Sequence, residues 1–203
     1  MNLLLLSRNM GAIKNYLLPN SNIGFIGTAG DVYPNPWFVI EDKEKLIKLN
    51  YNIINIDITK EDSNTIREKL NTIDALYVSG GNVYYLIQEI NKKNIKEDII
   101  NFINSNKLYI GASAGSCVCS NSTELYQDLD DPNMATELTL SGLGIIDFNI
   151  FPHYGKEKYA HVYDKVIEEY QTKYKIVPLR DNEALIVKDI DIYDILQSND
   201  IIE

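Results

Sequence analysis

The sequence predicts an α/β fold in which a mostly parallel sheet lies between two layers of helices, a three-layer sandwich. Short, almost continuously apolar runs alternate with amphipathic stretches along nearly the whole chain of 203 residues. Parallel strands that are buried on both faces read as uninterrupted apolar runs, and helices usually connect them. The last two apolar runs lie close together, which predicts an antiparallel hairpin at one edge of the sheet.

The predicted strands are short apolar runs rich in Ile, Leu, Val and Tyr, as is typical of buried strands. In chain order they cover residues 2–6, 23–29, 51–58, 75–80, 108–112, 144–151, 174–179, 183–189 and 190–195. The predicted helices lie between them at 37–49, 61–71, 83–91, 95–105, 114–120 and 156–171, the first directly after Asn35-Pro36. Residues 121–137 form the one long polar loop of this pattern.

The composition is that of a soluble globular protein, and its length predicts a single domain over residues 1–203. Hydrophobic residues make up 45% of the chain and charged residues 24%. The formal net charge of -10 excludes a general nucleic-acid-binding protein, because phosphate binding needs clustered Lys and Arg. The apolar run at the N-terminus is too short for a signal peptide, and no stretch reaches the length of a membrane span. We therefore expect a cytoplasmic protein without a membrane partner.

The two cysteines, Cys117 and Cys119, are expected to be buried free thiols. They are two residues apart in the predicted helix 114–120, where their side chains point away from each other, so a disulfide is not expected. The sequence has no second cysteine pair, and both histidines lie well downstream. We therefore expect no metal site, and no organic cofactor is needed for the chemistry described below.

A candidate nucleophile stands in the stretch GASAGS, where Ser113 lies between Gly111 and Gly115. The predicted strand 108–112 ends here and the predicted helix 114–120 begins. A nucleophile elbow needs small residues at these positions, because the turn is tight and bulky neighbours would block the backbone and the substrate. This pattern alone is also compatible with a plain strand-to-helix turn.

A serine hydroxyl needs a base, and histidine is the usual base near neutral pH. His153 follows an apolar strand and a proline, and in a parallel sheet sites form at the carboxyl ends of the strands. His161 falls inside the predicted helix 156–171, where a surface role is expected. Asp181 follows the next predicted strand and is the preferred carboxylate to orient the base, with Glu183 and Asp128 as competitors.

An acyl-transfer site also needs backbone N–H groups that stabilise an oxyanion. In an elbow the residue after the nucleophile, here Ala114, donates one of them. The turn Ser79-Gly80-Gly81-Asn82 follows the strand residues 75–78 and precedes a helix, so its glycines can supply a second donor. A plain helix start or a phosphate-binding turn is the alternative interpretation of this stretch.

Four segments in chain order, YVSGGNVYYL, YIGASAGS, DFNIFPHY and IVPLRDNEALIV, resemble the peptidase E (aspartyl dipeptidase)/cyanophycinase family of serine peptidases. The resemblance spans residues 20–190. It implies a fold similar to class I glutamine amidotransferases, which is flavodoxin-like, with serine in place of their catalytic cysteine. Residue by residue, it implies the following roles: Ser113 as nucleophile, His153 as base, Asp181 as acid, and Gly81 and Ala114 as oxyanion donors.

The resemblance also implies a short peptide as substrate, since family members cleave short peptides and peptidase E prefers an N-terminal aspartate. Such a preference needs a cation beside the substrate carboxylate. The stretch after His153 contains lysines but none of the arginines expected from peptidase E, and Arg180 is the nearest arginine in sequence. We expect Arg180, Gly80 and Asn82 to contact the substrate, and the protein to be a monomer or a homodimer.

Two other functions are compatible with the same residues. One is a different acyl hydrolase, an amidase or an esterase, that uses the same triad. The other is a non-catalytic member of the fold that binds a small metabolite at the strand ends. The chain order of serine, histidine and acid differs from the order in α/β-hydrolases, which argues against an ordinary esterase or lipase.

Overall fold

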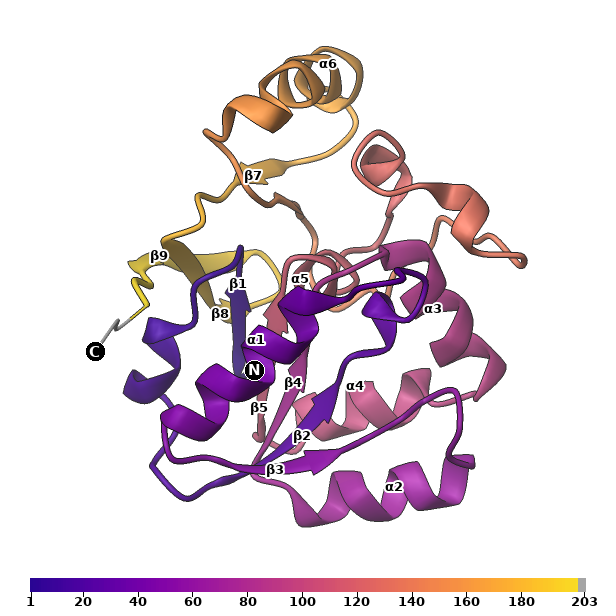
Figure 1. The fold of residues 1–203 in the computed structure, drawn as a ribbon. Coiled ribbons are helices and arrows are strands. Elements are labelled where there is room, and N and C mark those ends of the chain that lie inside the picture. Colours follow the sequence, from indigo (N-terminus) through magenta and orange to yellow (C-terminus); the bar gives the residue numbers. More distant parts are fainter. Residues whose placement is uncertain (201–203) are drawn as a thin grey trace.

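The computed structural model describes residues 1–200, which form a largely parallel sheet of seven strands and a separate pair of strands (Figure 1). The strands of the main sheet are β1 (Leu3–Leu6), β2 (Asn22–Ile26), β3 (Asn52–Asn55), β4 (Ala75–Val78), β5 (Leu108–Ala112), β8 (Glu183–Asp189) and β9 (Ile192–Gln197). Their order is β3-β2-β4-β5-β1-β8-β9, and the first five are mutually parallel. β8 runs antiparallel to β1 and to β9, which confirms the predicted hairpin at one edge.

Helices cover both faces of this sheet, as the apolar runs predicted. Helix α1 (Trp37–Lys48) and the 3-10 helix η1 (Gly11–Asn15) pack on one face. Helices α2 (Ser63–Thr72), α3 (Val83–Lys92), α4 (Lys96–Asn104) and α5 (Ala114–Cys117) pack on the other. The four leucines of β1 alternate between the two apolar cores and are all fully buried, so this central strand joins the layers.

Two of the predicted strands do not join the main sheet. β6 (Asn149–Phe151) and β7 (Ile176–Pro178) pair with each other in parallel, and helix α6 (Ala160–Tyr170) connects them. In Figure 1 β7 and α6 stand at the end of the main sheet where α5 begins. β6 and β7 do not lie between the strands of the main sheet, because β1 already pairs with β5 on one side and with β8 on the other.

The predicted strand 144–151 is therefore only partly correct. Residues 145, 146 and 148 are buried but lie outside β6. Their apolar character reflects burial against the core rather than pairing in a sheet, and periodicity alone does not distinguish these cases.

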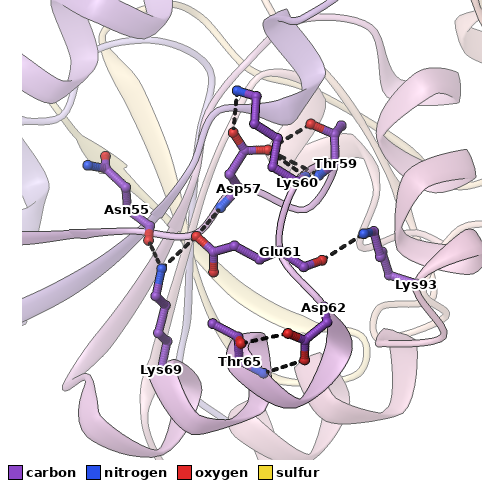
Figure 2. Close-up of polar contacts among 9 residues, drawn as sticks. All are labelled: Asn55, Asp57, Thr59, Lys60, Glu61, Asp62, Thr65, Lys69 and Lys93. Atoms are coloured by element: carbon purple, nitrogen blue, oxygen red, sulfur yellow. Dashed lines mark hydrogen bonds and ion pairs between the residues drawn. The ribbon is translucent and has the colours of Figure 1, made fainter.

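The connection between β3 and α2 is held by a polar network, shown in Figure 2. The Asp57 carboxylate accepts hydrogen bonds from Thr59 and Lys60, and Glu61 is held by Lys69 at 2.6 Å. Asp62 Oδ1 accepts from the backbone N–H groups of residues 64 and 65 at 2.9 and 3.0 Å. These bonds satisfy the free donors of the first turn, so α2 begins at Ser63 rather than at the predicted residue 61.

We expect Asp62→Ala to lower the free energy of unfolding, because the first turn of α2 loses its capping acceptor. Urea denaturation measures the change. Asp62→Asn is the matched control, since its amide oxygen keeps the acceptor and should retain most of the stability. Equal losses in the two variants would assign the effect to charge rather than to capping.

Candidate active site

The turn that presents Ser113 has a backbone conformation that few residues adopt. Ser113 has φ 49° and ψ -112°, a strained geometry for a residue with a side chain. A Cβ on Gly111 would lie 2.3 Å from the Gly115 carbonyl oxygen, and one on Gly115 would lie 2.0 Å from the Val78 carbonyl oxygen. Both glycines are therefore required by close backbone contacts, and these contacts hold Ser113 above the end of β5.

Three side chains that the sequence singled out lie in a continuous hydrogen-bonded row. Ser113 Oγ is 3.1 Å from His153 Nε2, and His153 Nδ1 is 2.7 Å from Asp181 Oδ1. With Nδ1 donating to the carboxylate, Nε2 is left to accept the serine proton. The arrangement has the geometry that a serine nucleophile, its base and an orienting acid require.

His153 and Asp181 follow β6 and β7, so both come from the small sheet. Pro152 ends β6, and His153 itself has φ 60°, which turns its ring back toward the main sheet. The ring stacks on Tyr159, with centroids 5.4 Å apart and planes at 22°. The three candidate side chains therefore follow the ends of strands that belong to two different sheets.

The Asp181 carboxylate has two further partners besides the histidine. Ser7 Oγ donates to its Oδ1 at 3.2 Å, and the Lys156 ammonium pairs with its Oδ2. Burial by itself would raise the pKa of Asp181, but the hydrogen bonds from His153 and Lys156 outweigh it and hold the pKa well below its ordinary value. Asp181 is therefore ionised at neutral pH, as an acid that orients a base must be.

Ser7, at the end of β1 in the main sheet, contacts both His153 and Asp181, which follow the strands of the small sheet. It is fully buried directly after β1, and its hydroxyl oxygen accepts a hydrogen bond from the His153 backbone N–H at 2.7 Å. One hydroxyl thus holds both His153 and Asp181. Sequence reasoning missed Ser7, although the rule that selected His153, a polar residue directly after an apolar strand, also applies to it.

The competing residues lie elsewhere. His161 is exposed on α6. Asp128 is exposed and pairs with Lys165 at 2.8 Å. Glu183 accepts a hydrogen bond from the backbone N–H of Arg180 at 2.8 Å. Among these acids, Asp181 is the one that the structure brings to His153.

Two backbone N–H groups beside Ser113 have no acceptor within residues 1–200, those of Gly81 and Ala114. Gly81 has φ 138°, and a Cβ there would lie 2.1 Å from the Ala29 carbonyl oxygen, so only glycine fits. Gly80 packs directly against the nucleophile, since its Cβ would lie 3.2 Å from Ser113 Cβ. The glycine turn and the elbow therefore meet at one point, as expected for two oxyanion donors.

These groups open onto a cavity of about 580 Å³. Aromatic side chains form much of its wall, among them Tyr33, Trp37 and Tyr159. Charged side chains of both signs also line it: Arg8, Asp42, Asp130, Lys156 and Lys158. The loop 121–137 therefore contributes to the cavity through Asp130, and a small molecule with groups of both charges matches these walls.

Asp42 is a buried acid below the glycine turn. Its Oδ2 accepts hydrogen bonds from Tyr77 Oη at 2.9 Å and Ser79 Oγ at 2.8 Å, and the residue is 7% exposed. Burial raises the pKa of Asp42 to about 6, and these two hydrogen bonds offset the effect only in part. Asp42 therefore ties the end of β4, which leads into Gly80, to helix α1.

Two residues expected to contact substrate have other surroundings. Asn82 is fully buried, caps α3 by accepting from the Tyr85 N–H, and donates to the Asp131 carbonyl at 2.9 Å. Arg180 does not line this cavity, and its guanidinium carbon lies 5.2 Å from the centroid of the Tyr154 ring. The cations that line the cavity are Arg8, Lys156 and Lys158.

Cys117 and Cys119 are buried free thiols. Burial raises the pKa of both, that of Cys119 to about 12, so neither is a reactive thiolate. Within residues 1–200 no group of three or more His, Cys, Asp and Glu side chains is arranged to hold a metal ion. No helix in the same range has the length and apolar character to cross a bilayer.

Comparisons with known proteins agree on one family. The model of peptidase family S51 matches residues 8–195. An uncharacterized peptidase of Listeria innocua is 32% identical over 173 residues, which cover 85% of this chain and 83% of that protein. The crystal structure of a candidate peptidase E protein from Listeria monocytogenes has a TM-score of 0.88 and 29% identity, covering 97% and 98% of the two chains. A peptidase E of Nostoc is 31% identical over 87 residues, which are 43% of this chain and 35% of that protein.

We expect Ser7→Ala to lower kcat on the order of tenfold with little change in KM, because the base and its acid lose a shared anchor. Steady-state kinetics with a hydrolysed peptide measure both constants. Ser105→Ala, which removes an exposed hydroxyl at the end of α4, is the control and should change neither. An unchanged kcat in Ser7→Ala would show that the hydroxyl does not position the base.

We expect Asp42→Asn to make the melting temperature less sensitive to pH between about 4 and 6. The folded pKa of Asp42 is raised to about 6 from 3.8, so the folded protein binds this proton more tightly and loses stability as pH rises through that interval. Asparagine keeps an acceptor for Tyr77 and Ser79 but has no such proton. Thermal melts measure the slope, with Asp164→Asn on the exposed side of α6 as control; parallel slopes in wild type and Asp42→Asn would contradict the expectation.

Proposed function

Because this chain belongs to peptidase family S51 and is a serine peptidase, we propose that it hydrolyses dipeptides and other short peptides with Ser113, His153 and Asp181 as its triad. The observation that carries this proposal is the hydrogen-bonded row from Ser113 Oγ through His153 to Asp181 at the wall of one cavity. A binding protein has no need for a serine, a base and an acid in this order.

In the first half of the reaction, Ser113 Oγ attacks the peptide carbonyl carbon while His153 Nε2 accepts the hydroxyl proton. The carbonyl oxygen becomes an oxyanion and accepts hydrogen bonds from the free N–H groups of Gly81 and Ala114. His153 then donates its proton to the leaving amine, which departs and leaves an acyl-enzyme on Ser113. Asp181 remains ionised and stabilises the imidazolium.

In the second half, water enters the place of the departed amine and loses a proton to His153 Nε2 as it attacks the acyl carbon. The second oxyanion uses the same two N–H donors. Its collapse breaks the bond to Ser113 Oγ, which recovers the proton from His153. Lys156 and Ser7 hold Asp181 throughout, so the carboxylate faces the ring without turning.

Short substrates match the cavity, whose volume of about 580 Å³ is that of a site for a small molecule. A preference for an N-terminal aspartate is a further part of the proposal, with Arg8 and Lys158 as the cations that would bind its side-chain carboxylate. Arg8 is held by Glu41 at 2.6 Å and lies over the Trp37 ring at 5.0 Å, so its guanidinium is fixed beside the cavity.

We expect Ser113→Ala and His153→Ala to lower kcat/KM on the order of a thousandfold or more, and Asp181→Asn to cost less, because Asp181 acts through the base. His161→Ala removes the exposed histidine and should leave the activity unchanged. Mass spectrometry of a dipeptide panel rich in Asp-X, with matched amides and esters, measures turnover at neutral pH.

A fluorophosphonate provides a second readout, since it labels an activated serine covalently whichever acyl substrate the enzyme prefers. The label should appear on Ser113 and disappear in His153→Ala. Undiminished turnover by Ser113→Ala would overturn the triad. Labelling together with cleavage of esters or amides but of no peptide would favour the other acyl hydrolases.

A further inference from the structure

The loop that follows β1, residues 7–12, supplies two residues of the site and has little regular structure of its own. Ser7 is hydrogen-bonded to both His153 and Asp181. Arg8 lines the cavity. Only the last two residues of the loop belong to the 3-10 helix η1. The positions of Ser7 and Arg8 therefore depend on contacts that this loop makes with other parts of the chain.

The segment directly after β9 binds the backbone groups of this loop. The Ala12 N–H donates to Ser198 Oγ at 3.2 Å, and that hydroxyl donates to the Asn9 carbonyl at 2.6 Å. The Met10 N–H donates to Asp200 Oδ1 at 2.9 Å. Buried backbone groups need such partners, and here they lie 186 to 190 residues further along the chain.

The loop and segment 198–200 also pack against each other closely. A Cβ on Gly11 would lie 1.8 Å from the Asn199 carbonyl oxygen, so only glycine allows this approach. Figure 1 shows the end of β9 beside η1. On its other side the loop is bonded to the residue after β7, since the Asn9 N–H donates to the Asp181 carbonyl at 2.9 Å. The loop is therefore held both by the neighbourhood of the triad acid and by segment 198–200.

A row of ion pairs continues from this segment to the wall of the cavity. Asp200 pairs with Lys45 of α1, Lys45 with Glu41 at 3.0 Å, and Glu41 with Arg8 at 2.6 Å. Burial by itself would lower the pKa of Lys45, but hydrogen bonds to Asp200 and Glu41 outweigh it and raise the pKa. The guanidinium carbon of Arg8 lies 5.0 Å from the centroid of the Trp37 ring. Asp200 is thus linked through two side chains to a cation of the cavity.

Holding the edge of the sheet does not account for Asp200. β9 already pairs with β8 from Ile192 to Gln197. The Ser198 N–H donates to the Asn182 carbonyl at 2.8 Å, which ties the end of the hairpin. Asp200 lies beyond these bonds, and both of its carboxylate oxygens are directed to the loop and to α1 instead.

We propose that Asp200 is a positioning residue of the active site, which holds the loop after β1 where Ser7 orients the base and its acid. Through the Met10 N–H it acts on the backbone of the loop, and through the ion pairs of α1 it acts on Arg8. Asp200 itself does not line the cavity, so its effect on the reaction passes through these residues. This inference rests on the proposed triad.

A double-mutant cycle between Asp200→Ala and Ser7→Ala tests the coupling. We expect Asp200→Ala to lower kcat on the order of tenfold, because a small displacement of the groups around a base is costly. In the Ser7→Ala background the same substitution should change kcat within about threefold, since the hydroxyl through which it acts is absent. A loss of kcat by the same factor in both backgrounds would overturn the proposal, because a residue that only stabilises the fold acts independently of Ser7.

Asp194→Ala is the matched control. It removes an acid of the same charge from β9, but this acid is exposed and pairs with Lys188. It should leave kcat unchanged. Melting temperatures establish that the variants fold, and Asp200→Asn, which keeps an acceptor for the Met10 N–H and loses the charge, replaces Asp200→Ala if the latter does not. An unchanged kcat in a folded Asp200 variant would also overturn the proposal.

Two readouts decide the inference even if no peptide is turned over. The rate at which a fluorophosphonate labels Ser113 replaces kcat in the same cycle. Trp37 is the single tryptophan of the chain, so acrylamide quenching of its fluorescence reports whether Arg8 covers the ring. We expect Asp200→Ala to raise the quenching constant as Arg8→Ala does, and Asp194→Ala to leave it unchanged. A quenching constant of Asp200→Ala equal to that of the wild type would overturn the link to Arg8.

Discussion

The close packing of backbone around Ser113 is the constraint on which the rest of the site depends. Gly115 lies against the Val78 carbonyl and Gly111 against the Gly115 carbonyl, so β4, β5 and α5 approach more closely than side chains would allow. This packing holds Ser113 in a strained conformation that an isolated turn would leave. It also brings Gly80 against the nucleophile, so the oxyanion donors and the hydroxyl are positioned by the same contact.

The acids around the cavity have different environments, and their pKa values therefore shift in opposite directions. Hydrogen bonds from His153 and Lys156 hold the pKa of Asp181 low despite its burial, whereas burial dominates for Asp42 and Asp130 and raises their pKa values. Asp181 is suited to stabilise an imidazolium, and Asp42 anchors the turn through Tyr77 and Ser79. Within residues 1–200 the Asp130 carboxylate accepts a hydrogen bond from the Val83 backbone N–H.

The small sheet of β6 and β7 supplies two thirds of the proposed triad. The sequence placed His153 and Asp181 after strands correctly, because apolar runs ending in proline or in polar residues have a clear local pattern. It did not separate these strands from the main sheet, since pairing depends on which edges other strands have already occupied. The same limit applies to residues 144–148, which are largely buried without belonging to β6.

The sequence by itself determined the α/β class, the edge hairpin, the elbow at Ser113 and the residue types of a serine hydrolase, because each depends on local periodicity or on glycine at a tight turn. Only the tertiary structure decided that Asp181, rather than Glu183 or Asp128, meets His153, and that Ser7 anchors both. It also showed that Arg8 and Asp130 line the cavity and that Arg180 does not. The physical reason is that these contacts join segments up to 174 residues apart in the chain. Whether such segments come together depends on the order of the strands and on how the loops pack, and neither produces a local pattern in the sequence.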